Sequence, residues 1–147
     1  MDDFIEITVD NTEIVNLLKR LSEKTQNLRP VMKIIAGIMM DSVEENFEQQ
    51  GRPKWPGLSL ATRKQRTKKG YWPGKILQMR GELTASVTSD YGNDHAIVGT
   101  NKKYAAIHQF GGKAGRGKKV NIPARPYLKL GGNALEEIIT AINKYLN

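Results

Sequence analysis

The sequence contains no cysteine and only two histidines, and these absences exclude several classes of protein. Without cysteine there is no disulfide framework and no thiolate metal site. The histidines, His95 and His108, lie 13 residues apart with no carboxylate cluster nearby, which does not match a zinc site. No apolar run approaches the ~20 residues of a membrane-spanning helix. The chain begins Met1-Asp2-Asp3, acidic where a secretory signal is basic, so we expect a cytoplasmic protein with no membrane partner.

Acidic residues are also missing from two long stretches that hold most of the positive charge. Residues 49–81 contain nine Lys or Arg, residues 95–135 contain eight, and neither stretch has an acid. The net charge of +8 is thus segregated, which predicts a positive face and an acidic partner, either nucleic acid or an acidic protein surface. A solvated face that only aids solubility is the alternative. At 147 residues, the chain 1–147 is most simply one domain.

The spacing of apolar residues predicts an α+β fold. The strongest signal is a long helix from Pro30 to about Gln49, ended by Gly51. A shorter helix begins at Asn11 or Thr12 and ends near Asn27. The other expected helical segments are residues 59–69, 104–110 and 134–146, and residues 76–83 are expected to form a short helix or turn broken by Gly81. The expected strands are residues 4–9, 86–91, 95–99 and 120–122. We therefore expect a small antiparallel β-sheet packed against the long helix, with additional short helices.

Residues 101–130 organise the rest of the chain. An aromatic turn with Tyr104 and Phe110 is followed by a glycine-lysine loop, residues 113–119, which is too polar to bury and is predicted to be flexible. Pro123 and Pro126 then bracket Arg125 and should hold it in one direction. Two anchored ends around a loose basic loop suggest a surface that is presented to a partner. Trp55, in a proline-glycine loop, is expected to anchor that loop to the body.

The sequence contains no motif that predicts an enzyme. The run from Gly112 to Lys118 imitates a phosphate-binding loop, but Lys119 stands where a Ser or Thr should bind Mg²⁺. Asp90 and Asp94 flank a predicted hairpin turn, where Asp is common for backbone reasons. No serine has an evident triad. We therefore expect no catalysis, no cofactor, no metal and no small-molecule substrate, and we expect His108 to hydrogen-bond within its turn.

Nucleic-acid binding stays open as the alternative function. Aromatic residues are interleaved with Lys and Arg, as in proteins that track phosphates and stack bases. No helix-turn-helix, RNP-like or zinc-finger pattern accompanies them. The signal is therefore one of composition alone.

An ordered set of short motifs resembles the phage virion morphogenesis family, which includes Mu-type protein G and tail completion proteins of temperate phages. The resemblance covers roughly residues 30–146, and the set comprises Phe47, Gly51–Trp55, Leu58, Thr62, Ile76–Gln78, Gly81–Leu83, Ser86, Val98–Asn101, Tyr104–Ala105, His108–Gly112 and Ile122–Leu128. Its most specific parts are the runs ending in His-Gln-Phe-Gly-Gly112 and in Pro-Ala-Arg-Pro-Tyr-Leu128.

The resemblance implies a non-enzymatic structural protein of a tailed phage or prophage, acting in virion assembly as a tail completion or head–tail joining component. It also implies a ring of identical copies, partners among other tail or neck proteins, and a place first in the host cytoplasm and then in the virion. Contact with DNA is the other use of the basic face. We expect the partner contacts to come from Lys113, Arg116, Lys118, Lys119 and Arg125. Tyr104, His108, Phe110 and Tyr127 are expected to hold the scaffold.

Overall fold

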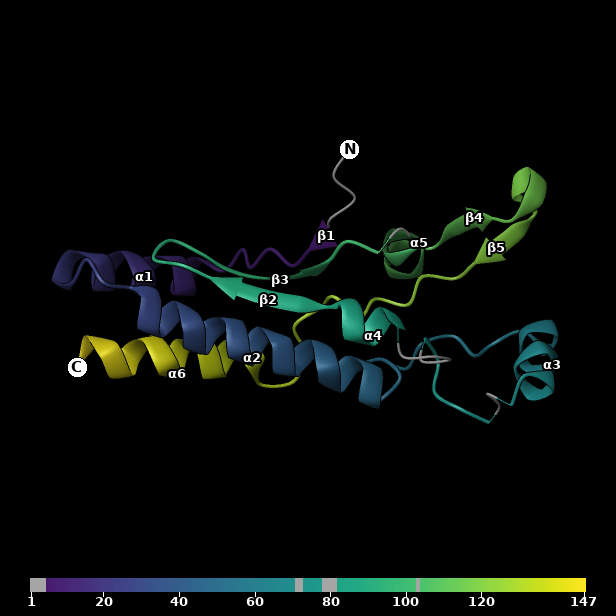
Figure 1. Ribbon diagram of the computed structural model, residues 1–147. Helices are drawn as coiled ribbons and strands as arrows, with labels where there is room; N and C mark the ends of the chain where they lie inside the picture. The colour runs from purple at the N-terminus through teal and green to yellow at the C-terminus, as the bar shows by residue number, and fades with distance from the viewer. Residues whose placement is uncertain (1–4, 71–72, 78–81, 103) are drawn as a thin grey trace.

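The computed structural model describes residues 5–70, 73–77, 82–102 and 104–147 (Figure 1). A long helix, α2 (Arg29–Glu48), runs along the middle of the molecule, with Pro30 in its first turn as predicted. Its buried apolar side chains recur at helical spacing and include Val31, Ile35, Met39, Val43 and Phe47. Ile34, the apolar residue directly before Ile35 on this helix, is 41% exposed. The predicted helix over residues 30–49 is confirmed.

A three-stranded antiparallel sheet covers one side of α2. It consists of β1 (Ile5–Glu6), β2 (Thr88–Tyr91) and β3 (Ala96–Thr100), in the order β1-β3-β2. β2 and β3 form the predicted hairpin, closed by a bond from the Gly92 N–H to the His95 carbonyl at 2.9 Å. Both strands contact α2, which confirms a small antiparallel sheet on the long helix. Phe4, part of the first predicted strand, lies outside the described residues.

Two amphipathic helices complete this body. In α1 (Thr12–Lys24) the Asn11 side chain caps the N-terminus by accepting a bond from the Ile14 N–H at 3.0 Å. α1 ends at Lys24 rather than near Asn27. α6 (Ala134–Leu146) has the predicted bounds and packs against both α1 and α2. Among the described residues, none of the helices combines the length and apolar character needed to cross a membrane.

The remaining elements are short. They are α3 (Leu60–Lys68), α4 (Glu82–Ser86), α5 (Ala105–Phe110), β4 (Gly112–Ala114), the single 3₁₀ turn η1 (Arg116–Lys118) and β5 (Val120–Ile122). Of the short helix or turn predicted over residues 76–83, residues 76 and 77 form a turn, residues 78–81 lie outside the described part, and α4 begins at Glu82. The predicted flexible loop is largely a hairpin, because β4 pairs antiparallel with β5. Gly115 and Gly117, at φ values of +79° and +71°, allow its tight tip.

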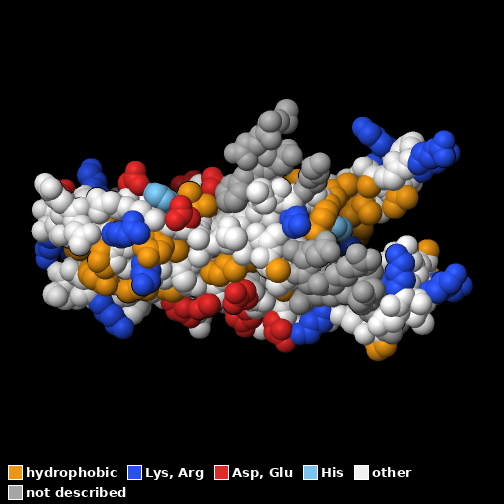
Figure 2. Space-filling model, in the orientation of Figure 1, with side chains coloured by type: hydrophobic (Ala, Val, Ile, Leu, Met, Phe, Trp, Pro, Cys, Tyr) orange, Lys and Arg blue, Asp and Glu red, His pale blue; other side chains and the backbone are white. Residues whose placement is uncertain are grey.

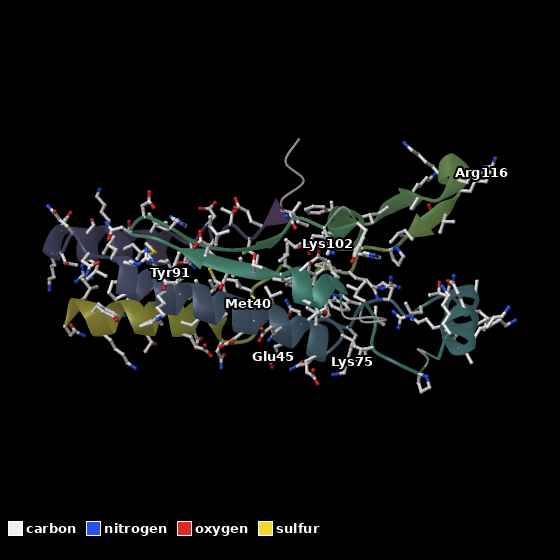
Figure 3. The ribbon with its side chains drawn as sticks, viewed as in Figure 1. Met40, Glu45, Lys75, Tyr91, Lys102 and Arg116 are labelled. Atoms are coloured by element: carbon white, nitrogen blue, oxygen red, sulfur yellow. The ribbon has the colours of Figure 1, made fainter. Side chains whose placement is uncertain are left out.

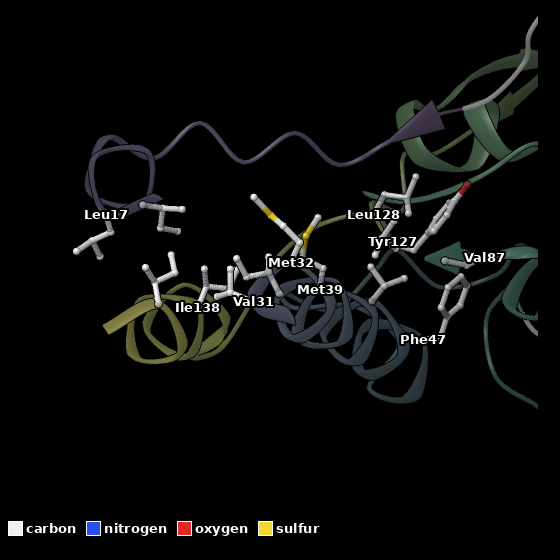
Figure 4. Packing of buried hydrophobic residues seen from close by; sticks show 14 of the residues in the cluster. Leu17, Val31, Met32, Met39, Phe47, Val87, Tyr127, Leu128 and Ile138 are labelled. Atoms are coloured by element: carbon white, nitrogen blue, oxygen red, sulfur yellow. The ribbon is translucent and has the colours of Figure 1, made fainter. Parts of the chain in front are cut away.

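The core is continuous from α1 and α6 through α2 to the segment after β5 (Figure 4). Its largest fully buried side chains are Tyr127 and Phe47, whose rings lie 5.2 Å apart between centroids. The Tyr127 hydroxyl donates to the Ala105 carbonyl at 2.8 Å, and burial raises the pKa of this phenol. Tyr127 therefore holds the scaffold in the way the sequence predicted.

Polar side chains fasten the segment around Tyr127 to the body. Asn46, 1% exposed, donates to the carbonyls of Tyr127 at 2.8 Å and Lys129 at 2.7 Å. The Trp55 Nε1–H donates to the Pro126 carbonyl at 3.0 Å, which confirms Trp55 as an anchor. Gln109 Oε1 accepts bonds from the N–H groups of Tyr127 and Leu128. These bonds hold residues 126–129, the segment that follows β5, against the body of the molecule.

Candidate functional site

Two arms project from one end of the molecule, beyond the end of α2 (Figure 1). The helical arm is residues 58–69, built around α3, and the hairpin arm is residues 112–122, built from β4, η1 and β5. Ser59 caps α3 through its hydroxyl, which accepts from the Thr62 N–H at 3.2 Å. Between the arms lies a cleft of about 590 Å³, visible as a hollow in Figure 2. Residues of both arms line this cleft.

The outer surfaces of both arms are basic. The hairpin arm exposes four of the five residues predicted to contact a partner, with Arg116 at its tip (Figure 3): Lys113, Arg116, Lys118 and Lys119. The helical arm exposes four further cations: Arg63, Lys64, Lys68 and Lys69. None of these eight forms a salt bridge within the described part of the chain. The arms thus carry their charge into solvent.

Arg125, the fifth predicted contact residue, has a different position. Its side chain is buried at 6% exposure. Its Nε and Nη2 groups donate to the carbonyls of Pro56 and Gly57, both at 2.9 Å. Proline on either side does hold Arg125 in one direction, but that direction is toward the loop that leads to α3. Arg125 therefore joins the bases of the two arms, and it is not part of the exposed basic tips.

A second arginine lies beside it at the floor of the cleft. Arg66, the buried residue of α3, is 6% exposed and donates from Nη1 to the Lys75 carbonyl at 3.0 Å. Burial lowers the pKa of both guanidinium groups, and the charge of Arg66 lowers the pKa of Arg125 further. No carboxylate pairs with either group within the described part of the chain. Nothing in the sequence around Arg66 distinguishes it from the exposed Arg63, Lys64, Lys68 and Lys69.

The walls of the cleft are mostly apolar. Leu58, Leu77, Leu83, Val120, Ile122 and Pro123 line it. Large apolar side chains are also exposed on the arms and near their bases, namely Leu60 at 59%, Val120 at 54% and Phe110 at 70%. The prediction that Phe110 holds the scaffold is wrong, since α5 is short and turns this ring outward. Tyr104, 37% exposed, lines the cleft and contacts the ring of His108.

His108 also lines the cleft. Its Nδ1 is buried and has no hydrogen-bond partner among the described residues, so this nitrogen does not make the bond expected within the turn. Burial, and to a smaller extent the charge of Arg125, lower the pKa of His108. The lowered pKa favours the uncharged form of the ring. Its backbone carbonyl accepts the Arg125 N–H at 2.8 Å, which makes the main chain of His108 part of the scaffold.

The other residues considered for chemistry do not form a site. Gly112 and Lys118 lie in a β-hairpin, which contradicts the strand-loop-helix context of a phosphate-binding loop. His95 forms an exposed pair with Asp94 at 2.7 Å and lies 3.7 Å from Asp90. No group of three or more metal-ligating side chains exists among the residues that the structure describes.

A model of the phage virion morphogenesis family matches residues 9–147, which include both arms and the cleft. The chain belongs to this family. The resemblance inferred from the motifs is thereby confirmed, and it extends to α1, in which no motif had been found. No solved structure matches the chain.

Three relatives share almost the full length of the chain. G protein 2 of the Mu-like prophage FluMu in Haemophilus influenzae is 46% identical, with 96% of this chain and 95% of that protein covered. Putative capsid assembly protein G of Escherichia phage Mu is 36% identical, with coverages of 95% and 92%. FluMu G protein 1 is 32% identical, with coverages of 97% and 95%.

Proposed function

We propose that the protein is a non-enzymatic component of phage or prophage virion assembly, acting in tail completion or head–tail joining as a ring of identical subunits. Its family and the name of the Mu relative, a putative capsid assembly protein, support a role in building the particle. Its partners are other tail or neck proteins. It acts in the host cytoplasm during assembly and then forms part of the virion.

The observation that carries this proposal is the two-armed end of the molecule. The two arms carry eight exposed cations there, together with exposed apolar side chains such as Leu60 and Val120. Such groups contribute little to the stability of the isolated chain, because exposed charges interact weakly and exposed apolar surface gains nothing from folding. Their arrangement suits a contact surface that is buried on assembly.

Replacement of Lys118 and Lys119 by Ala, in a phage or prophage that encodes this chain, tests the proposal. Both side chains are exposed, so the variant should keep the wild-type circular dichroism spectrum and melting temperature. We expect the yield of complete, infectious particles to fall while heads and tails still form. Replacement of Lys19 and Arg20 by Ala, on α1 and distant from the arms, is the matched control and should leave the yield unchanged. Normal completion by the arm variant would contradict the proposal.

Nucleic-acid binding is the second candidate, favoured by the same eight cations. Light scattering of the purified protein with duplex DNA, at low and at physiological salt, separates the two. We expect no DNA complex at physiological salt. Tight binding there, with a steep salt dependence that Lys118→Ala and Lys119→Ala make shallower, would make nucleic acid the partner.

A further inference from the structure

The floor of the cleft holds two buried cations without a counterion. Arg66 and Arg125 are each 6% exposed, they repel one another, and the chain supplies no carboxylate to either within its described part. Buried charges are costly unless they are paired. Each guanidinium has five N–H donors, of which Arg66 uses one and Arg125 uses two on main-chain carbonyls. Donors for an incoming anion therefore remain at the floor.

The walls indicate which kind of anion enters. Leucine, valine, isoleucine and proline side chains form most of the surface around the two arginines, and the polar groups among them, Ser59, Thr62, Gln65 and Asn121, are uncharged. Burial lowers the pKa of His108, which favours its uncharged ring. A phosphate backbone would bring strongly hydrated charge against these apolar walls. A carboxylate flanked by apolar side chains, as on the surface of a protein, can pair with the guanidinium groups at the floor while the apolar side chains pack against the walls.

The chain itself carries such a surface away from its arms. Asp41 and Glu44 on α2, with Glu136 and Glu137 in the first turn of α6, are exposed and form no salt bridge in the described part of the chain; we call them the acidic ridge. The two helices meet here, because the Gly131 N–H, just before α6, donates to the Ser42 hydroxyl at 2.9 Å. Figure 2 shows acidic side chains gathered along α2.

Apolar side chains accompany these carboxylates. Glu136 and Glu137 line a groove of about 480 Å³ between α2 and α6, together with Ile34 and Tyr145, which are 41% and 45% exposed, and with the exposed Lys144 at the far end of α6. The acidic ridge therefore combines carboxylates and apolar groups, as the floor and walls of the cleft do with opposite charge.

We propose that the cleft receives the acidic ridge of a second copy of this chain, and that a ridge carboxylate binds between Arg66 and Arg125. The two surfaces lie on different parts of the molecule, so the contact is head-to-tail and repeats from copy to copy, closing into a ring or continuing as a filament. This inference rests on the proposed function for the statement that identical copies meet. It adds which surfaces meet and which charges pair.

Sedimentation velocity of the purified full-length protein over a wide range of concentration tests the contact. We expect wild-type self-association, and Glu136→Gln with Glu137→Gln should raise its dissociation constant at least about tenfold, since each truncated charge pair leaves a buried guanidinium unpaired. The matched control is Glu13→Gln with Glu23→Gln on α1, which removes the same charge from exposed positions outside the ridge and should associate like wild type.

A mixing experiment tests the direction of the contact. Arg66→Gln disables the cleft, and it is used only if its melting curve shows a folded protein. Arg66→Met, which keeps an unbranched side chain but removes the charge, is the substitute otherwise. A mixture of the cleft variant with the ridge variant retains one intact cleft and one intact ridge per pair. We expect it to form dimers that grow no further, whereas each variant alone stays monomeric.

Three results would overturn the inference: a wild-type protein that stays monomeric at every concentration, a ridge variant that associates like wild type, and a control variant that loses as much as the ridge variant. Failure of the proposed function looks different. If deletion of the gene blocks particle completion while the ridge variant associates normally, the function stands and this contact is wrong. If the deletion leaves completion intact, the function itself fails, whatever the association shows.

Discussion

Replacement of Asn46 by Ala should strongly destabilise the protein, although Asn46 is a single polar residue on a helix. Its Nδ2 bonds the carbonyls of Tyr127 and Lys129, and its Oδ1 accepts the Arg52 Nε–H at 2.9 Å. One amide thus joins α2, the loop after it and the segment that follows β5. Alanine leaves all three groups in place and removes their common partner.

The size of the loss follows from what each group retains. The Tyr127 carbonyl keeps a bond from the Lys129 N–H at 3.0 Å, and Arg52 keeps its bonds to Ser42. Each of the three groups therefore loses about 1 kcal/mol, toward the lower end of the cost of an unsatisfied buried group, and the free energy of unfolding falls by about 3 kcal/mol. For a chain of this size the melting temperature should drop by about 6–12 °C. Asn46→Asp should cost at least as much, because a carboxylate then faces two carbonyl oxygens.

Urea unfolding followed by circular dichroism measures the change. With a slope of about 2 kcal/mol per molar, the midpoint should fall by about 1.5 M. Asn16→Ala, at an exposed position of α1, is the matched control and should stay within about 0.5 kcal/mol of wild type. A loss below about 1 kcal/mol for Asn46→Ala would refute the idea that its three bonds hold these segments together.

Three further predictions concern single side chains. The hydrogen bond that the His95 ring donates to the Asp94 carboxylate raises the pKa of His95. This pair therefore stabilises the fold below the unfolded pKa of 6.5 and loses its effect as pH rises through the higher folded value. Asp94→Asn should bring the NMR titration midpoint of His95 down, and an unchanged midpoint would contradict the pairing. Trp55→Phe removes the hydrogen bond to the Pro126 carbonyl and should lower the free energy of unfolding, measured in urea, by about 1–2 kcal/mol. An unchanged free energy of unfolding would contradict the anchoring role of this bond. Phe110→Ser, at 70% exposure, should change stability by less than about 0.5 kcal/mol, and a larger loss would show a packing role.

The sequence predicted the parts of the fold in which periodicity and end signals agree. α2 and α6 were found because apolar residues recur at helical spacing between clear boundaries, such as Pro30 at one end and Gly51 at the other. The β2–β3 hairpin was found because its strands flank a Gly-Asn-Asp turn. β4 was missed, since Gly112-Lys-Ala114 has neither alternation nor β-branched residues and becomes a strand only by pairing with β5.

Only part of the two arms and their cleft could be predicted from the sequence. Composition locates charge along the chain but does not show whether a guanidinium faces solvent or main-chain carbonyls. Arg125 and Arg66 bond main-chain carbonyls and are buried, whereas Lys113 and Lys64 are exposed, and the composition of the chain does not distinguish the two cases. An aromatic residue type predicts burial for Phe110, but its ring is 70% exposed at the end of the short helix α5.

The bonds from Arg125 to the carbonyls of Pro56 and Gly57 have a consequence for partner selection. Arg125 follows the hairpin arm and the two carbonyls precede the helical arm, so these bonds set the spacing of the arms within one molecule before any contact is made. A surface that is too wide cannot reach the floor, and one that is too narrow leaves the apolar walls in water. The fixed spacing of the arms therefore selects partner surfaces by their width, and only a surface of the right width can bring its charges to Arg66 and Arg125.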